Sequence, residues 1–179
     1  SIINQLIGLK EPTYTIPTML PSLFSKNIAI NNKNYTLNLW DMPSQEKFPS
    51  TTKFIVKDTN MAIFVYNITS RESFDTMDFW VNRVKNYLDE DSMCCIIGNM
   101  NDLFLSQIID ERTAKNYAKE RNMAFYLTSS KNEKNCNSIL LDLINQYINK
   151  RNSYSKKGTK KNEFDKKYYD LSIIKYINY

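Results

Sequence analysis

Two short apolar runs do most to constrain the fold of this chain. Residues 61–66 read MAIFVY and residues 93–97 read MCCII, and neither run contains a charged side chain. A continuous apolar run of this length is typical of a strand that is covered on both faces, as in a parallel sheet. The two runs therefore predict the interior of a layered α/β domain.

Helical patterns alternate with these runs. Apolar residues recur at helical spacing in residues 73–89 and in residues 136–148, and Asp110 marks the start of a helix over residues 110–121. A further helix is expected over residues 1–8. The expected inward faces of the two longest helices are Phe74, Met77, Val81, Val84 and Leu88 in one, and Ile139, Leu140, Leu143, Ile144 and Tyr147 in the other.

Three further strands complete the pattern. Residues 23–30 and 34–41 read as an antiparallel hairpin joined by a polar turn at residues 31–33, and residues 123–127 form a short strand after a helix. Strands that alternate with helices predict a doubly wound, mostly parallel α/β sheet. In such sheets a ligand binds beyond the carboxyl ends of the strands, so the side chains that follow the strands are the candidates for a site.

Four motifs carry a resemblance to a known family. Residues 40–48 read WDMPSQEKF and resemble the WDTAGQERF signature of the Rab branch of the Ras-like small GTPases. Residues 98–102 (GNMND) resemble the family's GNKxD element, and residues 128–131 (TSSK) resemble its TSAK element. Residues 65–74 (VYNITSRESF) resemble the VYDIT..ESF element of Rab proteins. Together the motifs identify most of the chain as a Rab-like member of the Ras superfamily, with the sheet of the small GTPase (P-loop NTPase) type.

The resemblance implies a guanine site at two of these motifs. An Asp carboxylate can accept hydrogen bonds from N1–H and the exocyclic amine of guanine, a pair of donors that adenine lacks, so Asp102 would select guanine. Asn99 would brace the loop. Met100 stands where the family has the Lys whose stem covers the base, and a Met can still pack there. Backbone N–H groups near the base oxygen would come from Thr128, Ser129 and Ser130.

The resemblance places the phosphate and metal chemistry earlier in the chain. Thr18 and Asp41 would hold Mg²⁺, Asp41 through water, and Gln45 would orient the water that attacks the γ-phosphate of GTP. Ser44 stands where the family has a Gly whose N–H meets that phosphate, and its Cβ restricts the backbone there. Pro43 stiffens the same turn. We therefore expect binding of GTP or GDP to persist, with hydrolysis slow or absent.

The family's phosphate loop is missing from the sequence. No GxxxxGK[ST] string occurs and, counted back from Thr18, the loop would end immediately before Ser1. The resemblance also implies that the first strand, which lies in the middle of the family's sheet, is absent, and this would leave two unpaired strand edges. We expect the sequence to be a piece of a longer protein, which would hydrolyse GTP if the complete chain carries the loop. A chain that naturally dispenses with the loop is the alternative.

Charge divides the chain unevenly. The excess behind the net charge of +5 sits late, where residues 150–167 read KRNSYSKKGTKKNEFDKK, so we expect a GTPase domain over residues 1–150 and a basic tail over residues 151–179. Such a tail suits an anionic membrane surface or a nucleic acid, or it is simply solvated. Residues 171–176 could lie on a membrane surface as a short amphipathic segment, but a tail that packs on the body or is simply disordered is favoured. No Cys follows Cys136, so anchoring by a prenylated Cys is not expected.

Cysteine and histidine usage excludes several kinds of site. The three cysteines show no zinc or disulfide spacing, which favours a reducing, cytoplasmic compartment. The absence of His excludes histidine bases and His metal sites within this sequence. No apolar run of the sequence is long enough to cross a bilayer.

Three functions follow as hypotheses. The first is a Rab-like GTPase that binds GTP or GDP with Mg²⁺ and switches among effector, exchange and GTPase-activating proteins in vesicle traffic, as a cytoplasmic protein peripheral on endomembranes. The second is a degenerate GTPase fold that serves as a protein-interaction scaffold without nucleotide turnover. The third is nucleic-acid binding by the basic tail, which is disfavoured because no aromatic-interleaved platform or reading motif accompanies the tail.

Overall fold

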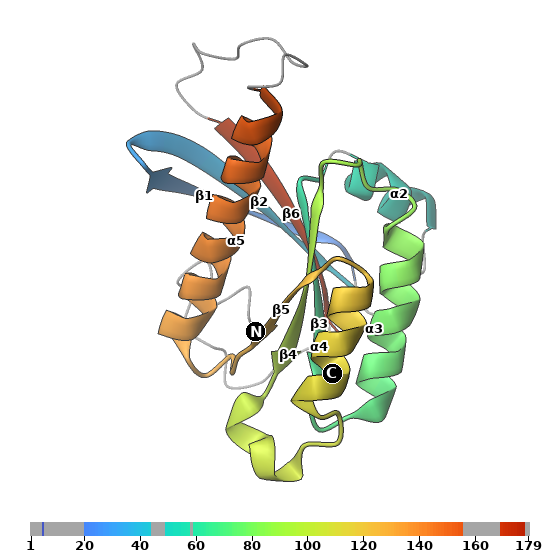
Figure 1. Cartoon of the computed structure of the whole chain (residues 1–179). Coiled ribbons are helices and arrows are strands. Elements are labelled where there is room, and N and C mark those ends of the chain that lie inside the picture. Colours follow the sequence, from blue (N-terminus) through green and yellow to red (C-terminus); the bar gives the residue numbers. More distant parts are fainter. Residues whose placement is uncertain (1–4, 6–19, 44–48, 58, 156–168, 178–179) are drawn as a thin grey trace.

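The computed structural model describes residues 5, 20–43, 49–57, 59–155 and 169–177. Its centre is a six-stranded sheet in the spatial order β1-β2-β6-β3-β4-β5 (Figure 1). Every neighbouring pair is parallel except β1 and β2, so the predicted doubly wound, mostly parallel α/β sheet is confirmed. The strands are β1 (Ser22–Ile30), β2 (Lys33–Met42), β3 (Met61–Asn67), β4 (Met93–Asn99), β5 (Ala124–Leu127) and β6 (Tyr169–Ile177). The helices are α2 (Pro49–Lys57), α3 (Arg71–Val84), α4 (Glu111–Glu120) and α5 (Glu133–Ser155), with a short 3₁₀ helix, η1 (Asn101–Ser106).

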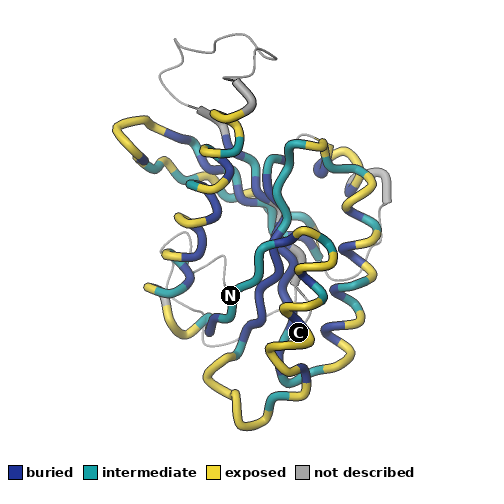
Figure 2. The backbone as a smooth tube through the Cα atoms, viewed as in Figure 1, coloured by how far each residue is buried: buried dark blue, intermediate teal, exposed yellow. Residues whose placement is uncertain are grey.

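Helices cover both faces of the sheet. α5 packs on one face, and α2, α3 and α4 pack on the other (Figure 1). Alternate residues of β3 point to opposite faces: Ile63 and Val65 join the core under α5, whereas Phe64 and Tyr66 join the core under α3 and α4. Figure 2 shows the resulting buried strands, with the exposed residues on the outer surfaces of the helices. Burial on both faces explains why the run in residues 61–66 is continuously apolar.

The β1–β2 hairpin follows from its turn. Asn31 and Asn32 have φ values of 50° and 61°, the left-handed conformations that a two-residue type I′ turn requires and that Asn tolerates. The strands pair from Ile30–Lys33 at the turn to Ser22–Asp41 at the far end, slightly beyond the expected bounds. The register therefore brings Asp41 to the carboxyl end of β2.

The helices begin largely where the sequence predicts. Ser70 caps α3 by accepting a hydrogen bond from the N–H of Ser73 at 3.1 Å, and Asp110 caps α4 in the same way. α3 ends at Val84, before the expected end at residue 89. α2 was not expected, and α5 is longer than expected at both ends. All the predicted inward residues of α5 are buried: Ile139, Leu140, Leu143, Ile144 and Tyr147.

The middle of the sheet is filled by the last strand of the chain. β6 lies between β2 and β3 and pairs in parallel with both. Asn60 fixes the start of β6, because its backbone N–H donates to the Ser172 carbonyl at 2.9 Å and its side-chain oxygen accepts from the Ser172 N–H at 2.8 Å. Leu171 and Ile173 are buried in the core under α5. β6 thus occupies the position that the resemblance assigns to the family's first strand.

Two expectations from the sequence are corrected by β6. The central position of the sheet is not vacant, because the alternating segment that begins at Leu171 supplies the backbone pairing that β2 and β3 need. The interpretation of residues 171–176 as a segment on a membrane surface is wrong for the same reason, and the alternative of a segment packed on the body holds. Residues from both sides of the expected boundary at residue 150 belong to one sheet, and α5 crosses that boundary.

Of the helices within the described ranges, none combines the length and the apolar character needed to span a bilayer.

Candidate functional site

Two loops meet at the carboxyl ends of β4 and β5. The first follows Asn99, the last residue of β4, and the second begins at Thr128, directly after β5. Their backbones are bonded to each other: the Asn101 N–H donates to the Thr128 carbonyl at 3.0 Å, and the Thr128 N–H donates to the Gly98 carbonyl at 2.9 Å. The fold therefore brings together the two motifs for which the sequence predicts guanine recognition.

Gly98 is explained by packing within this loop pair. A Cβ at Gly98 would lie 2.6 Å from the Leu127 side chain and 2.9 Å from the hydroxyl of Tyr66. Tyr66 is fully buried and Leu127 is partly buried, so a side chain at residue 98 would require a shift within the close-packed core. The glycine of the GNMND motif is thus required by the contact between β4, β5 and β3.

Asn99 braces the two loops. Its side chain is 5% exposed, and its Oδ1 accepts a hydrogen bond from the Ser130 N–H at 3.0 Å. A buried amide with a fixed acceptor holds one loop against the other, since leaving that N–H without a partner is unfavourable. The predicted bracing position of Asn99 is therefore the position in which the structure places it.

Asp102 is held by both of its carboxylate oxygens. The Ser129 hydroxyl donates to Oδ1 at 2.7 Å, and the Lys131 ammonium group lies 2.6 Å from Oδ2. The hydrogen bonds from Lys131 and then Ser129 lower the pKa of Asp102 below its ordinary value. Asp102 is therefore an ionised acceptor at neutral pH, which is the state that two guanine donors require.

Backbone N–H groups at several positions of the second loop donate to protein acceptors. The N–H of Thr128 donates to Gly98, that of Ser130 to Asn99, and that of Lys131 to the Ser129 hydroxyl at 3.2 Å. The predicted approach of the backbone N–H groups of Thr128, Ser129 and Ser130 to a base oxygen stays a prediction.

Met100 has an unusual backbone conformation. Its φ and ψ are 65° and 33°, in the left-handed region, whereas the other described non-glycine residues with positive φ are all Asn. For a residue with a long side chain this conformation is unfavourable by roughly 1–2 kcal/mol. The conformation is imposed by the turn between β4 and η1, which carries Asp102 toward Ser129.

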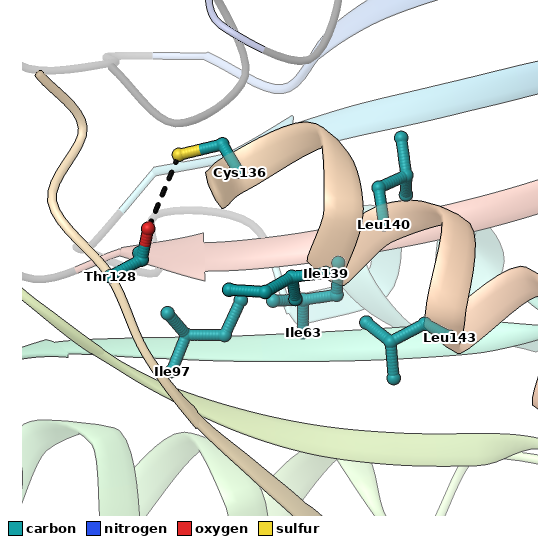
Figure 3. Close-up of a pocket in the computed structure, with 7 residues that line it drawn as sticks. All are labelled: Ile63, Ile97, Thr128, Cys136, Ile139, Leu140 and Leu143. Carbon is teal, nitrogen blue, oxygen red and sulfur yellow. Dashed lines mark hydrogen bonds between the residues drawn. The ribbon is translucent and has the colours of Figure 1, made fainter. Parts of the chain in front are cut away.

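Thr128 points away from the loops. Its hydroxyl is within 3.5 Å of the Cys136 sulfur, and it lines a small pocket beneath α5 with aliphatic side chains of the sheet and helix (Figure 3). A nucleotide needs donors and charges that such a wall cannot supply. The pocket is therefore a small gap in the core packing, and the side chain of Thr128 faces that core. Its other lining residues are Ile63, Ile97, Cys136, Ile139, Leu140 and Leu143.

A second polar pair lies at the end of β2. Asp41 is the register partner of Lys175 on β6, and the Lys175 ammonium group is 3.0 Å from Asp41 Oδ1. The side chains are 3% exposed for Lys175 and 15% for Asp41. Burial lowers the pKa of Lys175, and the Asp41 carboxylate opposes that shift. Lys175 was missed in the sequence, although a lysine in register with the inward residues Leu171 and Ile173 was a signal that could have found it.

The two ends of the candidate site share one face of the sheet. Asp41 and Asn99 have the strand parity of the residues that face α5. Asp41 lies level with Lys175, Ile63 and Cys95 across the strands, and Asn99 comes later along β4. With about 4.8 Å between strands and about 3.3 Å per residue, these positions are roughly 20 Å apart. Asp41 and Asn99 therefore lie toward the same face of the sheet, and their joint action on one nucleotide stays a prediction.

Of the two residues that the resemblance assigns to magnesium, Asp41 lies within the described residues, and its surroundings do not fit the ion. Mg²⁺ takes oxygen ligands in octahedral geometry at about 2.0–2.1 Å, whereas Asp41 Oδ1 already faces a buried ammonium group. Within the described ranges, no cluster of three or more His, Cys, Asp or Glu residues could hold a metal. Thr18, Ser44 and Gln45 lie outside the described residues, so their predicted roles stay predictions.

Comparisons with known proteins identify related sequences. The Ras family model matches residues 1–149. Ras-related protein Rab-21 of Bos taurus is 32% identical over 133 residues, which cover 74% of this chain and 60% of the relative. Rab-21 of Dictyostelium discoideum is 34% identical over 131 residues (73% and 62%), and Rab-2B of the same organism is 31% identical over 129 residues (72% and 64%). The chain thus spans less than two thirds of the length of these relatives, and β6 lies beyond the residues that the family model matches.

The family model matches residues 1–149, the motifs occur in the family's order, and two of them contact each other at the ends of β4 and β5. The chain belongs to the Ras family and is a Rab-like member of the Ras superfamily of small GTPases.

Proposed function

We propose that this protein binds guanine nucleotides through the loops after β4 and β5 and selects the base with Asp102. The observation that carries the proposal is the arrangement of that carboxylate. Its Oδ1 accepts a hydrogen bond from the hydroxyl of Ser129, a residue that is 9% exposed. Its Oδ2 pairs with Lys131, whose side chain is 72% exposed. One oxygen is thus positioned by the protein, and the other is held by a partner that can leave.

Exchange of Lys131 for a guanine edge is favourable in energy. An exposed ion pair contributes only about 0–1 kcal/mol, because water screens it. The N1–H and the exocyclic amine of guanine would form two charge-assisted hydrogen bonds with the same carboxylate. In this proposal Met100 packs on the purine, and a backbone N–H of the Ser129–Ser130 segment approaches the base oxygen.

The proposal extends to a nucleotide-dependent switch in intracellular vesicle traffic. Similarity to proteins named Ras-related protein Rab-21 and Rab-2B supports this extension. GTP and GDP are the proposed ligands, and effector, exchange and GTPase-activating proteins are the proposed partners. Thr18 is proposed to contact the γ-phosphate, and Gln45 is proposed to orient the attacking water. Hydrolysis is proposed to be slow because Pro43 and Ser44 restrict the turn that precedes Gln45. The basic segment after α5 is proposed to contact a membrane surface peripherally.

Substitution of Asp102 tests the base selection. Asp102→Asn keeps the shape but exchanges an acceptor for an amide donor, and xanthine carries a carbonyl oxygen where guanine carries its exocyclic amine. We expect the variant to lose affinity for fluorescent GDP and to gain affinity for xanthosine diphosphate, each by at least about tenfold, which corresponds to one hydrogen bond to a charged group. Titrations followed by fluorescence anisotropy would measure both.

The matched control is Asp75→Asn, which removes another exposed carboxylate that pairs with a basic side chain, Arg71, on α3. It should leave both affinities unchanged. Wild-type protein that binds no guanine nucleotide at millimolar concentration would refute the proposal.

A scaffold without nucleotide turnover is the second candidate function. The Asp41–Lys175 pair favours it, because a carboxylate that is neutralised inside the protein has less need of a metal–phosphate ligand. Hydrogen exchange of residues 35–57 in the presence of GDP and of a non-hydrolysable GTP analogue separates the two functions. Equal protection in both states supports the scaffold, whereas protection by the triphosphate alone supports the switch.

A further inference from the structure

Lys175 brings a cation to a place where a metal would otherwise be expected. Its ammonium group is 3.0 Å from Asp41 Oδ1, and its side chain is 3% exposed. The strand that carries it lies outside the residues that the Ras family model matches. The pair therefore joins Asp41, which lies within the matched residues, to a strand that lies beyond them.

The position of Lys175 is fixed by the sheet on both sides. Its register partner on β2 is Asp41, and its register partner on β3 is Ile63. The start of β6 is tied down through Asn60, whose side-chain amide also donates to the hydroxyl of Tyr147 on α5 at 3.0 Å. The pairing fixes the backbone at Lys175, and its side chain is 3% exposed. Moving the ammonium group away from Asp41 would place a charge against apolar surroundings, which is unfavourable.

A divalent cation and this ammonium group exclude each other at Asp41. Any metal bound to the carboxylate, directly or through one water, would lie within a few ångströms of the lysine charge, where repulsion in a poorly solvated site is strong. The Asp41 side chain is only 15% exposed, so replacement of its ammonium partner by an apolar group would weaken the charge compensation of this carboxylate. The two cations are therefore alternatives.

We propose that Lys175 is the permanent counter-ion of Asp41 and takes the place of a divalent metal there. The folded domain consequently has its charge balance at this position without Mg²⁺. The inference goes beyond nucleotide binding and does not require it, because it concerns the charge balance of the folded chain itself.

Thermal unfolding of the full chain without nucleotide tests the proposal. The wild type should have the same midpoint in EDTA and in millimolar MgCl₂. Lys175→Met should lower the midpoint by about 10 °C in EDTA, as expected for a buried charge without its partner in a chain of this size. Millimolar MgCl₂ should restore part of that loss, whereas NaCl at equal ionic strength should not.

Two further variants keep the result interpretable. Asp41→Asn/Lys175→Met removes both charges, and it should regain most of the lost midpoint and show no response to Mg²⁺. Lys115→Met removes an exposed lysine that pairs with Glu111 on α4, and it should resemble the wild type in both buffers. If Lys175→Met fails to fold, recovery of folding in the double variant supports the counter-ion role. Failure of the double variant as well would show that Lys175 is needed for packing and would overturn the proposal.

Two results on the wild type and the single variant also decide against it. One is a wild-type midpoint that rises with Mg²⁺ and loses this rise in Asp41→Asn. The other is a Lys175→Met variant as stable as the wild type in EDTA. Titration of the wild type with GDP, in EDTA and in MgCl₂, tests the proposed nucleotide binding separately. Absence of binding would overturn nucleotide recognition but would leave the result of the unfolding experiment valid.

Discussion

Asp102 and Asp41 each lie close to a lysine ammonium group, at 2.6 Å and 3.0 Å, but the two ion pairs differ in burial and origin. Lys131 is two residues from Ser129 in the same loop, and its side chain is 72% exposed. Lys175 comes from the far end of the chain and is 3% exposed. The first pair is open to solvent, whereas the second is largely enclosed by the fold. The exposure of the lysine partner is thus the main physical difference between the two carboxylates.

Removal of β6 is expected to have the largest effect on this comparison. A chain that ends after Ser155 would leave β2 and β3 with unpaired edges and would remove Leu171 and Ile173 from the core. The loss should exceed the whole stability of a typical domain, roughly 5–15 kcal/mol, so no cooperative unfolding should remain. Circular dichroism during heating would measure it, with a chain that ends after Ile177 as the control. Cooperative melting of the shorter chain would mean that β6 is dispensable.

Asn99→Ala should have the next largest effect, in the loop pair that carries Asp102. The substitution leaves the Ser130 N–H without its buried acceptor, so the free energy of unfolding should fall by about 1–3 kcal/mol, and the Asp102 loop should loosen. Denaturation in guanidinium chloride would measure the change. Asn86→Ala is the matched control, because Asn86 donates a hydrogen bond to a backbone carbonyl from an exposed position on the opposite helix layer. Equal effects of the two substitutions would contradict the bracing role of Asn99.

Met100→Asn should be mildly stabilising. Asn tolerates the left-handed conformation better than Met, so we expect a gain of about 0.5–1 kcal/mol in the free energy of unfolding. The reverse substitution at a turn remote from the site, Asn122→Met, should lose a similar amount, since Asn122 has a φ of 54°. Chemical denaturation of both variants provides the measurement. A loss of stability in Met100→Asn would indicate that the Met side chain contributes packing that outweighs the backbone term.

Lys131→Met should have the smallest effect, and one that depends on pH. The pKa of Asp102 is lowered in the folded state, so its contribution to stability is present above the ordinary value of 3.8 and disappears as the pH falls through the lowered pKa. The variant should therefore be less stable than the wild type by a few tenths of a kcal/mol near pH 7 at low salt, because the pair is exposed. Urea titrations from pH 3 to pH 8 would follow the difference. If the stability difference between the two proteins instead grew as the pH fell, its pH dependence would be opposite to the expected one, and the ionised Asp102 could not be its source.

The exposed end of the candidate site could be predicted because its parts are local. Asn99 and Asp102 follow one apolar run, Ser129 and Ser130 follow another, and parallel strands place their carboxyl ends together. What the sequence left open there was the detailed bonding: Ser129 rather than Lys131 as the buried partner of Asp102, and the left-handed backbone at Met100. These features depend on how the two loops pack against each other, and that contact cannot be inferred from a local residue pattern.

The buried end could not be predicted in the same way. Leu171, Ile173 and Lys175 alternate as a strand should, but the alternation does not say where such a short segment lies or what it pairs with. Its place depends on an unfilled position between β2 and β3, which are far from it along the chain. Pairing at such separation is decided by the hydrogen bonds and burial available in the assembled sheet.

The amino-acid sequence by itself determined the α/β layering, the hairpin with its Asn31–Asn32 turn, and the motif residues at the ends of β4 and β5, because each is set by periodicity or turn chemistry over a few residues. Only the tertiary structure decided that the central strand is β6 and that the partner of Asp41 is Lys175. The physical reason is that an open position between two strands accepts whichever segment satisfies its backbone groups and its core. A charge carried into that position must then find its counter-charge inside the protein.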